Sequence, residues 1–90
     1  MQIRFLQLDP NRIFLLGYEL KLSPTEEILL RAVAEGGKCG TDDLAKLLSD
    51  GVNRTNVSVH INSINRKAKR ISSRKLIVYE SKQYRINNFM

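Results

Sequence analysis

The sequence predicts an α+β domain built from an N-terminal antiparallel sheet, three helices and a C-terminal β-hairpin. Apolar residues fall in short strand-like runs over residues 1–22, recur at helical spacing over residues 23–71, and return as two short runs over residues 76–87. Turn-forming residues separate these segments. A length of 90 residues fits one domain, so residues 1–90 are expected to fold as a single unit.

The N-terminal segment is expected to form three strands joined by short turns. Ile3–Leu8 is rich in apolar residues and stops at the turn cluster Asp9-Pro10-Asn11, and Arg12–Leu16 is a second apolar run. Apolar and charged residues then alternate over Tyr18–Leu22, as in a half-buried strand. The side chains on the buried face of this strand would be Tyr18, Leu20 and Leu22. Short turns between strands favour an antiparallel meander.

The first helix is expected to begin at Ser23-Pro24-Thr25-Glu26. Ser23 can cap the free backbone amides, Pro24 suits the first helical position, and Glu26 can complete a capping box. Gly36-Gly37 is typical of a helix end. The apolar residues spaced to face the core are Ile28, Leu29, Ala32 and Val33.

A second, shorter helix is expected to begin at Thr41-Asp42-Asp43, with Gly51 beyond its end. Its inward-facing residues would be Leu44, Leu47 and Leu48. The carboxylate pairs Glu26/Glu27 and Asp42/Asp43 resemble acid–base pairs. Both stand in first helical turns, however, where negative charge is favoured by the helix dipole, so we interpret them as structural.

The third helix is expected over residues 55–71 and is the longest. One narrow apolar stripe recurs at steps of four, three, four and three, through Val57, Ile61, Ile64, Ala68 and Ile71. At about 100° per residue, the opposite side carries basic and hydrogen-bonding residues. They are Thr55, Val59, Asn62, Arg66 and Lys69, flanked by Ser63 and Arg70.

Two strand-like runs, Leu76–Glu80 and Gln83–Asn87, close the chain as a hairpin around Ser81-Lys82. In this hairpin Tyr84 is expected to pack back on the core, with Lys82 at the tip.

The charge is concentrated in the C-terminal part of the chain. Residues 1–53 contain six Lys/Arg and eight Asp/Glu, a net charge of −2. Residues 54–90 contain nine Lys/Arg and a single acid, Glu80, a net charge of +8. Such a basic end is typical of a protein that binds a polyanion. A solvated basic face without a partner is the alternative.

Three segments carry a resemblance to a known family. Residues 5–30, FLQLDPNRIFLLGYELKLSPTEEILL, are similar to an N-terminal sheet followed by a Leu-Thr-x-x-Glu-x-x-Leu-Leu helix start. Residues 56–68, NVSVHINSINRKA, resemble Val-Asp-Val-His-Ile-x-x-Leu-Arg-x-Lys-Leu, and residues 76–86, LIVYESKQYRI, stand where a wing has Ile-x-Thr-Val-Arg-Gly-x-Gly-Tyr-x-Leu. These motifs belong to the OmpR/PhoB-type winged-helix effector domains, which include the ToxR-like transcriptional activators.

The resemblance implies a winged helix-turn-helix fold and sequence-specific binding of double-stranded DNA by a transcriptional regulator. The third helix would enter the major groove, and the wing would lie near the backbone or the minor groove. RNA polymerase and a second copy of the chain on DNA are the further partners that it implies.

The sequence departs from the family pattern at five places. Ser63 and Asn65 stand where the family commonly has Arg, and Glu80 replaces an Arg of the wing. Ser81 and Gln83 replace both wing glycines. Because base recognition depends on individual side chains, we expect the fold to be kept and the preferred DNA sequence to differ.

The candidate DNA-binding residues divide into base readers and phosphate contacts. Asn62 can pair with an adenine edge, Val59 can touch a thymine methyl group, and Ser63 can bond a base or a phosphate. Phosphate contacts are expected from Thr55, Asn56, Arg66, Lys69, Arg70 and Lys82. His60 borders the apolar stripe and is interpreted as packed or phosphate-contacting.

No catalytic site, metal site or cofactor is expected. His60 and Cys39 are the single histidine and the single cysteine, which excludes an intrachain disulfide and argues against a metal site. Cys39 is expected to be a small buried residue in a reducing, cytoplasmic protein. No apolar run approaches the roughly 20 residues of a membrane span, and no signal peptide is visible.

The alternative function is a winged helix that contacts proteins in a signalling or secretion assembly. The altered wing and the two missing arginines keep this alternative open. A steep salt dependence of DNA binding would separate the two functions.

Overall fold

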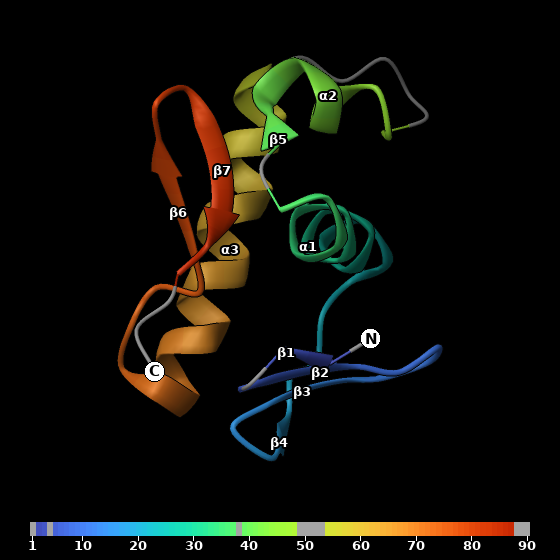
Figure 1. Cartoon of the computed structure of the whole chain (residues 1–90), viewed down its shortest axis with the longest axis vertical. Helices are drawn as coiled ribbons and strands as arrows, with labels where there is room; N and C mark the ends of the chain where they lie inside the picture. Colours follow the sequence, from blue (N-terminus) through green and yellow to red (C-terminus); the bar gives the residue numbers. More distant parts are fainter. Residues whose placement is uncertain (1, 4, 38, 49–53, 88–90) are drawn as a thin grey trace.

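The computed structural model describes residues 2–3, 5–37, 39–48 and 54–87, which form an α+β fold (Figure 1). Its elements follow the chain in this order: β1 Gln2–Ile3, β2 Leu6–Leu8, β3 Ile13–Leu15, β4 Tyr18–Glu19, α1 Pro24–Gly36, β5 Cys39–Gly40, α2 Thr41–Ala45, α3 Arg54–Ser72, β6 Ile77–Glu80 and β7 Gln83–Ile86. The expected N-terminal antiparallel sheet, three helices and C-terminal hairpin are confirmed.

The N-terminal sheet has four antiparallel strands in the order β1-β2-β3-β4, where the sequence predicts three. The prediction of one strand over Ile3–Leu8 is wrong, because the chain reverses within it and pairs Ile3 with Leu6. A continuous strand would send Phe5 and Leu6 to opposite faces of the sheet. The reversal allows both side chains to enter the core, where they are 7% and 1% exposed.

The strand predicted over Tyr18–Leu22 is also shorter, since β4 ends at Glu19. Leu20 is buried and Leu22 is half-buried, as the alternation predicts. Tyr18 is 68% exposed, because it stands on an edge strand beside the turn at Leu16-Gly17.

Helix α1 begins as its sequence predicts. The Ser23 side chain accepts a hydrogen bond from the Glu26 backbone N–H, and the Glu26 carboxylate accepts one from the Ser23 backbone N–H, which confirms the capping box. The predicted inward position of Ile28 is wrong, since this side chain is 46% exposed. The face of α1 that packs against the core instead carries Leu29, Leu30, Val33 and Ala34.

Helix α2 ends at Ala45, earlier than predicted. Leu44 and Leu48 are buried as expected, but Leu47 is 46% exposed, because the chain leaves the α-helical path before reaching it. The predicted stop at Gly51 lies outside the described residues.

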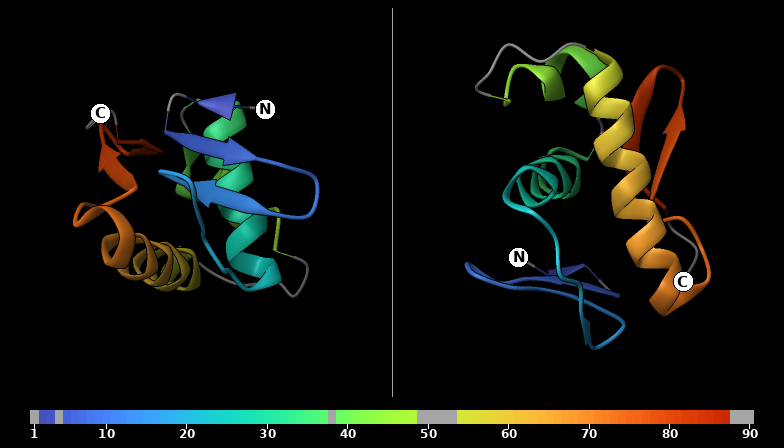
Figure 2. Two further views of the ribbon diagram at one scale, coloured as in Figure 1. Left: turned by 90° about the horizontal axis from the view of Figure 1, so that it is seen from below. Right: turned by 180° about the vertical axis from the view of Figure 1, so that it is seen from behind.

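The apolar stripe of α3 is confirmed. Its buried members are Val57, Ile61, Ile64 and Ala68, with Ile71 half-buried at the end. Helix α1 lies on one side of α3 and the β6–β7 hairpin on the other (Figure 1). In the right-hand view of Figure 2, α3 lies nearest the viewer, and no other element covers it. One long side of α3 therefore remains available for a partner.

The β6–β7 hairpin is the wing predicted from the sequence. Glu80 pairs with Gln83, so Ser81 and Lys82 alone form the turn. Both turn residues have positive φ, 54° and 64°, as in the two-residue turns that match the twist of antiparallel strands. Strand β5 joins the sheet by pairing with β7, which the sequence does not predict because two residues carry no periodic signal.

Candidate nucleic-acid interface

Most of the predicted DNA-binding residues lie together on the uncovered side of α3. The exposed ones are Asn56, Val59, Asn62, Arg66, Lys69 and Arg70, and we call these six residues the α3 face. His60 is half-buried at the border of the apolar stripe, and Lys82 is exposed at the wing turn. The side chain of Thr55 lies outside the described part of the chain. Helix α3 contains no Asp or Glu, so its exposed side has a positive potential.

Ser63 is placed differently from the α3 face. It is half-buried, and its hydroxyl hydrogen-bonds to the carboxylate of Glu26 in α1. A contact between Ser63 and DNA would require this hydroxyl to leave Glu26. The sequence carries no signal for this bond, because the two residues belong to different helices.

Glu26 is the centre of a buried polar cluster between α1 and α3. Its side chain is 5% exposed, and its Oε1 accepts hydrogen bonds from Lys67 Nζ at 2.5 Å and the Ser23 backbone N–H at 2.8 Å. Burial by itself raises the pKa of Glu26, but the hydrogen bonds from Lys67, Ser63 and Ser23, with the positive charge of Lys67, lower it to about 2. The cluster fixes α3 against α1. It also pairs one basic residue of α3, Lys67, with an acid of the protein itself.

Acid should weaken the fold through Glu26. A carboxyl whose folded-state pKa is lowered contributes stability above its unfolded pKa and loses it as the pH falls through the folded pKa. From a shift of 4.5 to about 2 we expect a loss of about 3 kcal/mol between pH 4.5 and pH 2. Urea unfolding at stepped pH measures this loss. Glu26→Gln should be less stable than wild type at pH 7 and should flatten the profile, and an unflattened profile would assign the acid sensitivity to another group.

Asn65 connects α3 to the wing. Its side chain is 7% exposed, its Oδ1 accepts hydrogen bonds from the backbone N–H groups of Leu76 and Ile77, and its Nδ2 donates to the Ile77 carbonyl. The donor–acceptor distances of these three hydrogen bonds are, in the same order, 3.0, 2.8 and 2.9 Å. The sequence marks Asn65 only as a departure from the family pattern, so its role as a structural link was missed.

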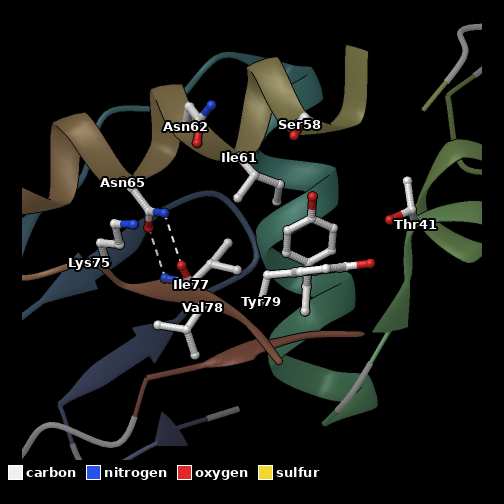
Figure 3. Close-up of a pocket in the computed structure, with 10 residues that line it drawn as sticks. Thr41, Ser58, Ile61, Asn62, Asn65, Lys75, Ile77, Val78 and Tyr79 are labelled. Atoms are coloured by element: carbon white, nitrogen blue, oxygen red, sulfur yellow. Dashed lines mark hydrogen bonds between the residues drawn. The ribbon is translucent and has the colours of Figure 1, made fainter. Parts of the chain in front are cut away.

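A groove of about 780 Å³ separates α3 from the wing. Ser58, Ile61 and Asn62 stand on the α3 side, Val78 and Tyr79 on the wing side, and Asn65 and Lys75 lie toward one end with Thr41 toward the other (Figure 3). The lining residues include hydroxyl, amide and ammonium groups and no carboxylate. The groove therefore suits a negatively charged or polar partner.

Two basic residues of the C-terminal part are paired within the protein. Lys67 pairs with Glu26, and Arg85 pairs with Glu80 across the wing at 3.3 Å. Arg85 is thus held by the acid that replaces a family arginine. Exposed basic side chains among the described residues of this part are Arg66, Lys69, Arg70, Arg74, Lys75 and Lys82.

Cys39 differs slightly from expectation, since it is half-buried rather than buried. Its Sγ lies 3.4 Å from the Ala32 carbonyl, and burial followed by the negative charge of Asp43 raises the pKa of the thiol. The thiol therefore stays protonated at neutral pH and is a poor nucleophile.

Within the described residues, no His, Cys, Asp and Glu side chains gather in a group of three that could hold a metal ion. In the same part of the chain, no helix is both long enough and apolar enough to cross a membrane.

Comparison with known proteins establishes the fold. No protein-family model and no curated protein sequence matches the chain. Among solved structures, the DNA-binding domain of response regulator AdeR, crystallised in complex with an intercistronic region, is similar over 97% of both chains, with a TM-score of 0.84 and 13% sequence identity. The chain has the winged-helix fold. In this winged helix α3 occupies the third-helix position and β6–β7 the wing, as the sequence resemblance predicts.

Proposed function

We propose that this winged helix binds double-stranded DNA sequence-specifically as a transcriptional regulator, with α3 in the major groove and the wing near the backbone. The observation that carries the proposal is the α3 face: six exposed side chains, three of them basic, along a helix of 19 residues without an acid. An α-helix fits the major groove, and basic side chains beside it bind phosphates. The similarity to a domain solved with DNA supports the same function.

The α3 face suggests a division of roles. We assign Asn62 to an adenine edge and Val59, which is 57% exposed, to a thymine methyl group. Arg66, Lys69 and Arg70 would bind phosphates and set the register of the helix on the duplex.

Four other candidates stand around the α3 face: Thr55, His60, Ser63 and Lys82. Thr55, together with Asn56 of the α3 face, would bind a phosphate with the amides of the first turn, and Lys82 would bind one from the wing. His60 would pack at the edge of the contact. Ser63 would contribute mainly by holding Glu26. RNA polymerase as a partner and pairing of two copies on DNA are parts of the proposal that the sequence resemblance implies. A cytoplasmic location is the part that the single cysteine suggests.

The salt dependence of DNA binding tests the proposal. With about four to six phosphate contacts, the logarithm of the association constant should fall against the logarithm of salt concentration with a slope of about −4 to −5. Fluorescence anisotropy with a labelled duplex of random sequence measures it. A flat response, or no binding at low salt, would reject DNA binding and favour the protein-contact function.

A protein-contact function is the second candidate, and two exposed apolar residues favour it. Val59 on α3 and Tyr79 on the wing are 57% and 56% exposed, as in many surfaces that bind proteins. Selection of bound sequences from a random DNA pool separates the candidates. Enrichment of one site, single or repeated, is expected for a DNA-binding regulator, and no enrichment is expected for a protein-contact module.

Substitutions on the α3 face should separate base reading from phosphate binding. Arg66→Ala should weaken binding to every duplex by a similar factor and reduce the salt slope by about one. Asn62→Ala should weaken binding to the selected site by about 1–3 kcal/mol and leave binding to random DNA nearly unchanged. Lys21→Ala, an exposed lysine in the N-terminal part, is the control and should affect neither. Equal losses for Asn62→Ala on selected and random DNA would contradict its role as a base reader.

A further inference from the structure

We propose that Tyr79 is a further side chain through which the wing contacts DNA, by donating its phenolic O–H to a backbone phosphate at the groove between α3 and the wing. This inference rests on the proposed function and adds a contact at the same interface. The sequence by itself predicts a wing contact from Lys82 and indicates no role for Tyr79.

The position of Tyr79 in the wing makes it available. Strand pairing places Tyr79 opposite Tyr84 and Ile77 opposite Ile86, and alternation puts these four side chains on one face of the hairpin. Ile77, Tyr84 and Ile86 are between 1% and 8% exposed, whereas Tyr79 is 56% exposed. Tyr79 is therefore the outermost member of a row that begins in the core and ends in solvent.

The ring of Tyr79 is held in place by Tyr84. The two ring centroids are 4.7 Å apart at an interplanar angle of 54°, a tilted aromatic contact of the kind that stabilises cross-strand pairs. Tyr84 is itself buried, so it provides a fixed support. Because the Tyr79 ring has few alternative positions, less conformational entropy is lost when its hydroxyl binds a partner.

The groove in front of Tyr79 has the chemistry of a phosphate site. Across it, Ser58 and Asn62 of α3 offer a hydroxyl and an amide, and Lys75 offers an ammonium group at one end (Figure 3). Since α3 and the wing form its two walls, a DNA strand that touches both must pass over the groove. The lining residues carry no negative charge that would repel it.

Two charged residues on the other face of the wing, Glu80 and Arg85, are less suited to this contact. Arg85 is occupied by Glu80, through two hydrogen bonds of 3.3 Å. Alternation places both residues on the face of the hairpin opposite Tyr79. The negative charge of Glu80 would also oppose a phosphate on that face.

Because the Tyr79 hydroxyl is uncharged, its contact with DNA can be distinguished from that of a basic side chain. Tyr79→Phe removes one hydroxyl and keeps the ring contact with Tyr84, so the fold should remain as stable as wild type in urea. Binding to any duplex should weaken about tenfold, as expected for loss of one hydrogen bond to a charged oxygen. The salt slope should stay that of wild type, because a phenol releases no counterion when it binds. Tyr18→Phe, the other exposed tyrosine, lies on the N-terminal sheet and is the matched control, for which no change is expected.

Fluorotyrosine NMR gives a second measurement on the intact protein. The chain has three tyrosines, and Tyr→Phe variants assign their ¹⁹F signals. Addition of duplex DNA should shift the Tyr79 signal and leave the Tyr18 signal in place. Wild-type affinity of Tyr79→Phe, with an unshifted Tyr79 signal, would overturn the inference while leaving DNA binding intact. Failure of the wild-type protein to bind duplex DNA would overturn both proposals.

Discussion

Replacement of Asn65 with leucine is expected to destabilise the domain by about 3–6 kcal/mol. The amide makes three buried hydrogen bonds to the backbone at the start of β6. Leucine would leave two N–H groups and one carbonyl without partners, each at a cost of about 1–3 kcal/mol. Since small domains have total stabilities of about 5–15 kcal/mol, a large fraction of the protein should unfold or lose its wing.

Two related variants sharpen this test. Asn65→Asp keeps an oxygen that can accept from both N–H groups, and in its protonated form it keeps a donor for the Ile77 carbonyl, so in urea at acid pH its unfolding midpoint should fall between those of wild type and the leucine variant. Asn62→Leu lies three residues earlier on the exposed side of α3 and should change stability by less than about 0.5 kcal/mol. A wild-type unfolding midpoint for Asn65→Leu would show that the wing is held by packing alone.

Shortening Ile64 to alanine should cost about 2–5 kcal/mol. Ile64 is 0% exposed at the centre of the apolar stripe, and truncation of a buried isoleucine removes apolar contacts and leaves a cavity. Thermal and urea unfolding followed by circular dichroism measure the loss. Val59→Ala on the same helix is the control, since Val59 is 57% exposed and should shift stability by less than about 0.5 kcal/mol. The reverse order of the two effects would mean that the proposed DNA-binding side of α3 is the side that packs.

Elements with strong local signals were predictable from the sequence. The capping box at Ser23 and Glu26 involves residues three positions apart, and the stripe of α3 repeats over about four turns, so both appear in the sequence itself. The positions that failed have weak or conflicting local signals. Leu47 continues the apolar spacing of α2, but a helix of five residues ends before reaching it.

The candidate interface, too, was predictable only where its signals are local in the sequence. Helical spacing identified five of the six residues of the α3 face, since exposure follows from the position of the stripe. Asn56 was instead expected from its place near the start of the helix. The contacts of Ser63, Asn65 and Lys67 could not be predicted, because their partners are 11 to 41 residues away and only the assembled fold brings them together. These contacts engage one candidate, Ser63, in a bond inside the protein and explain one departure from the family pattern, Asn65.

The pairing of β5 with β7 affects how the chain can fold. It joins Cys39 to Tyr84 and so closes a loop that spans half of the chain, whereas each N-terminal hairpin joins near neighbours. Long loops close at a greater entropic cost, and contacts across them tend to form late. We therefore expect the N-terminal strands and α1 to order early. Strand β5 should pair with β7 only when α3 has docked. The β5–β7 pairing would then be the last part of this sheet to reach its native geometry in refolding and the first to lose amide protection in hydrogen exchange.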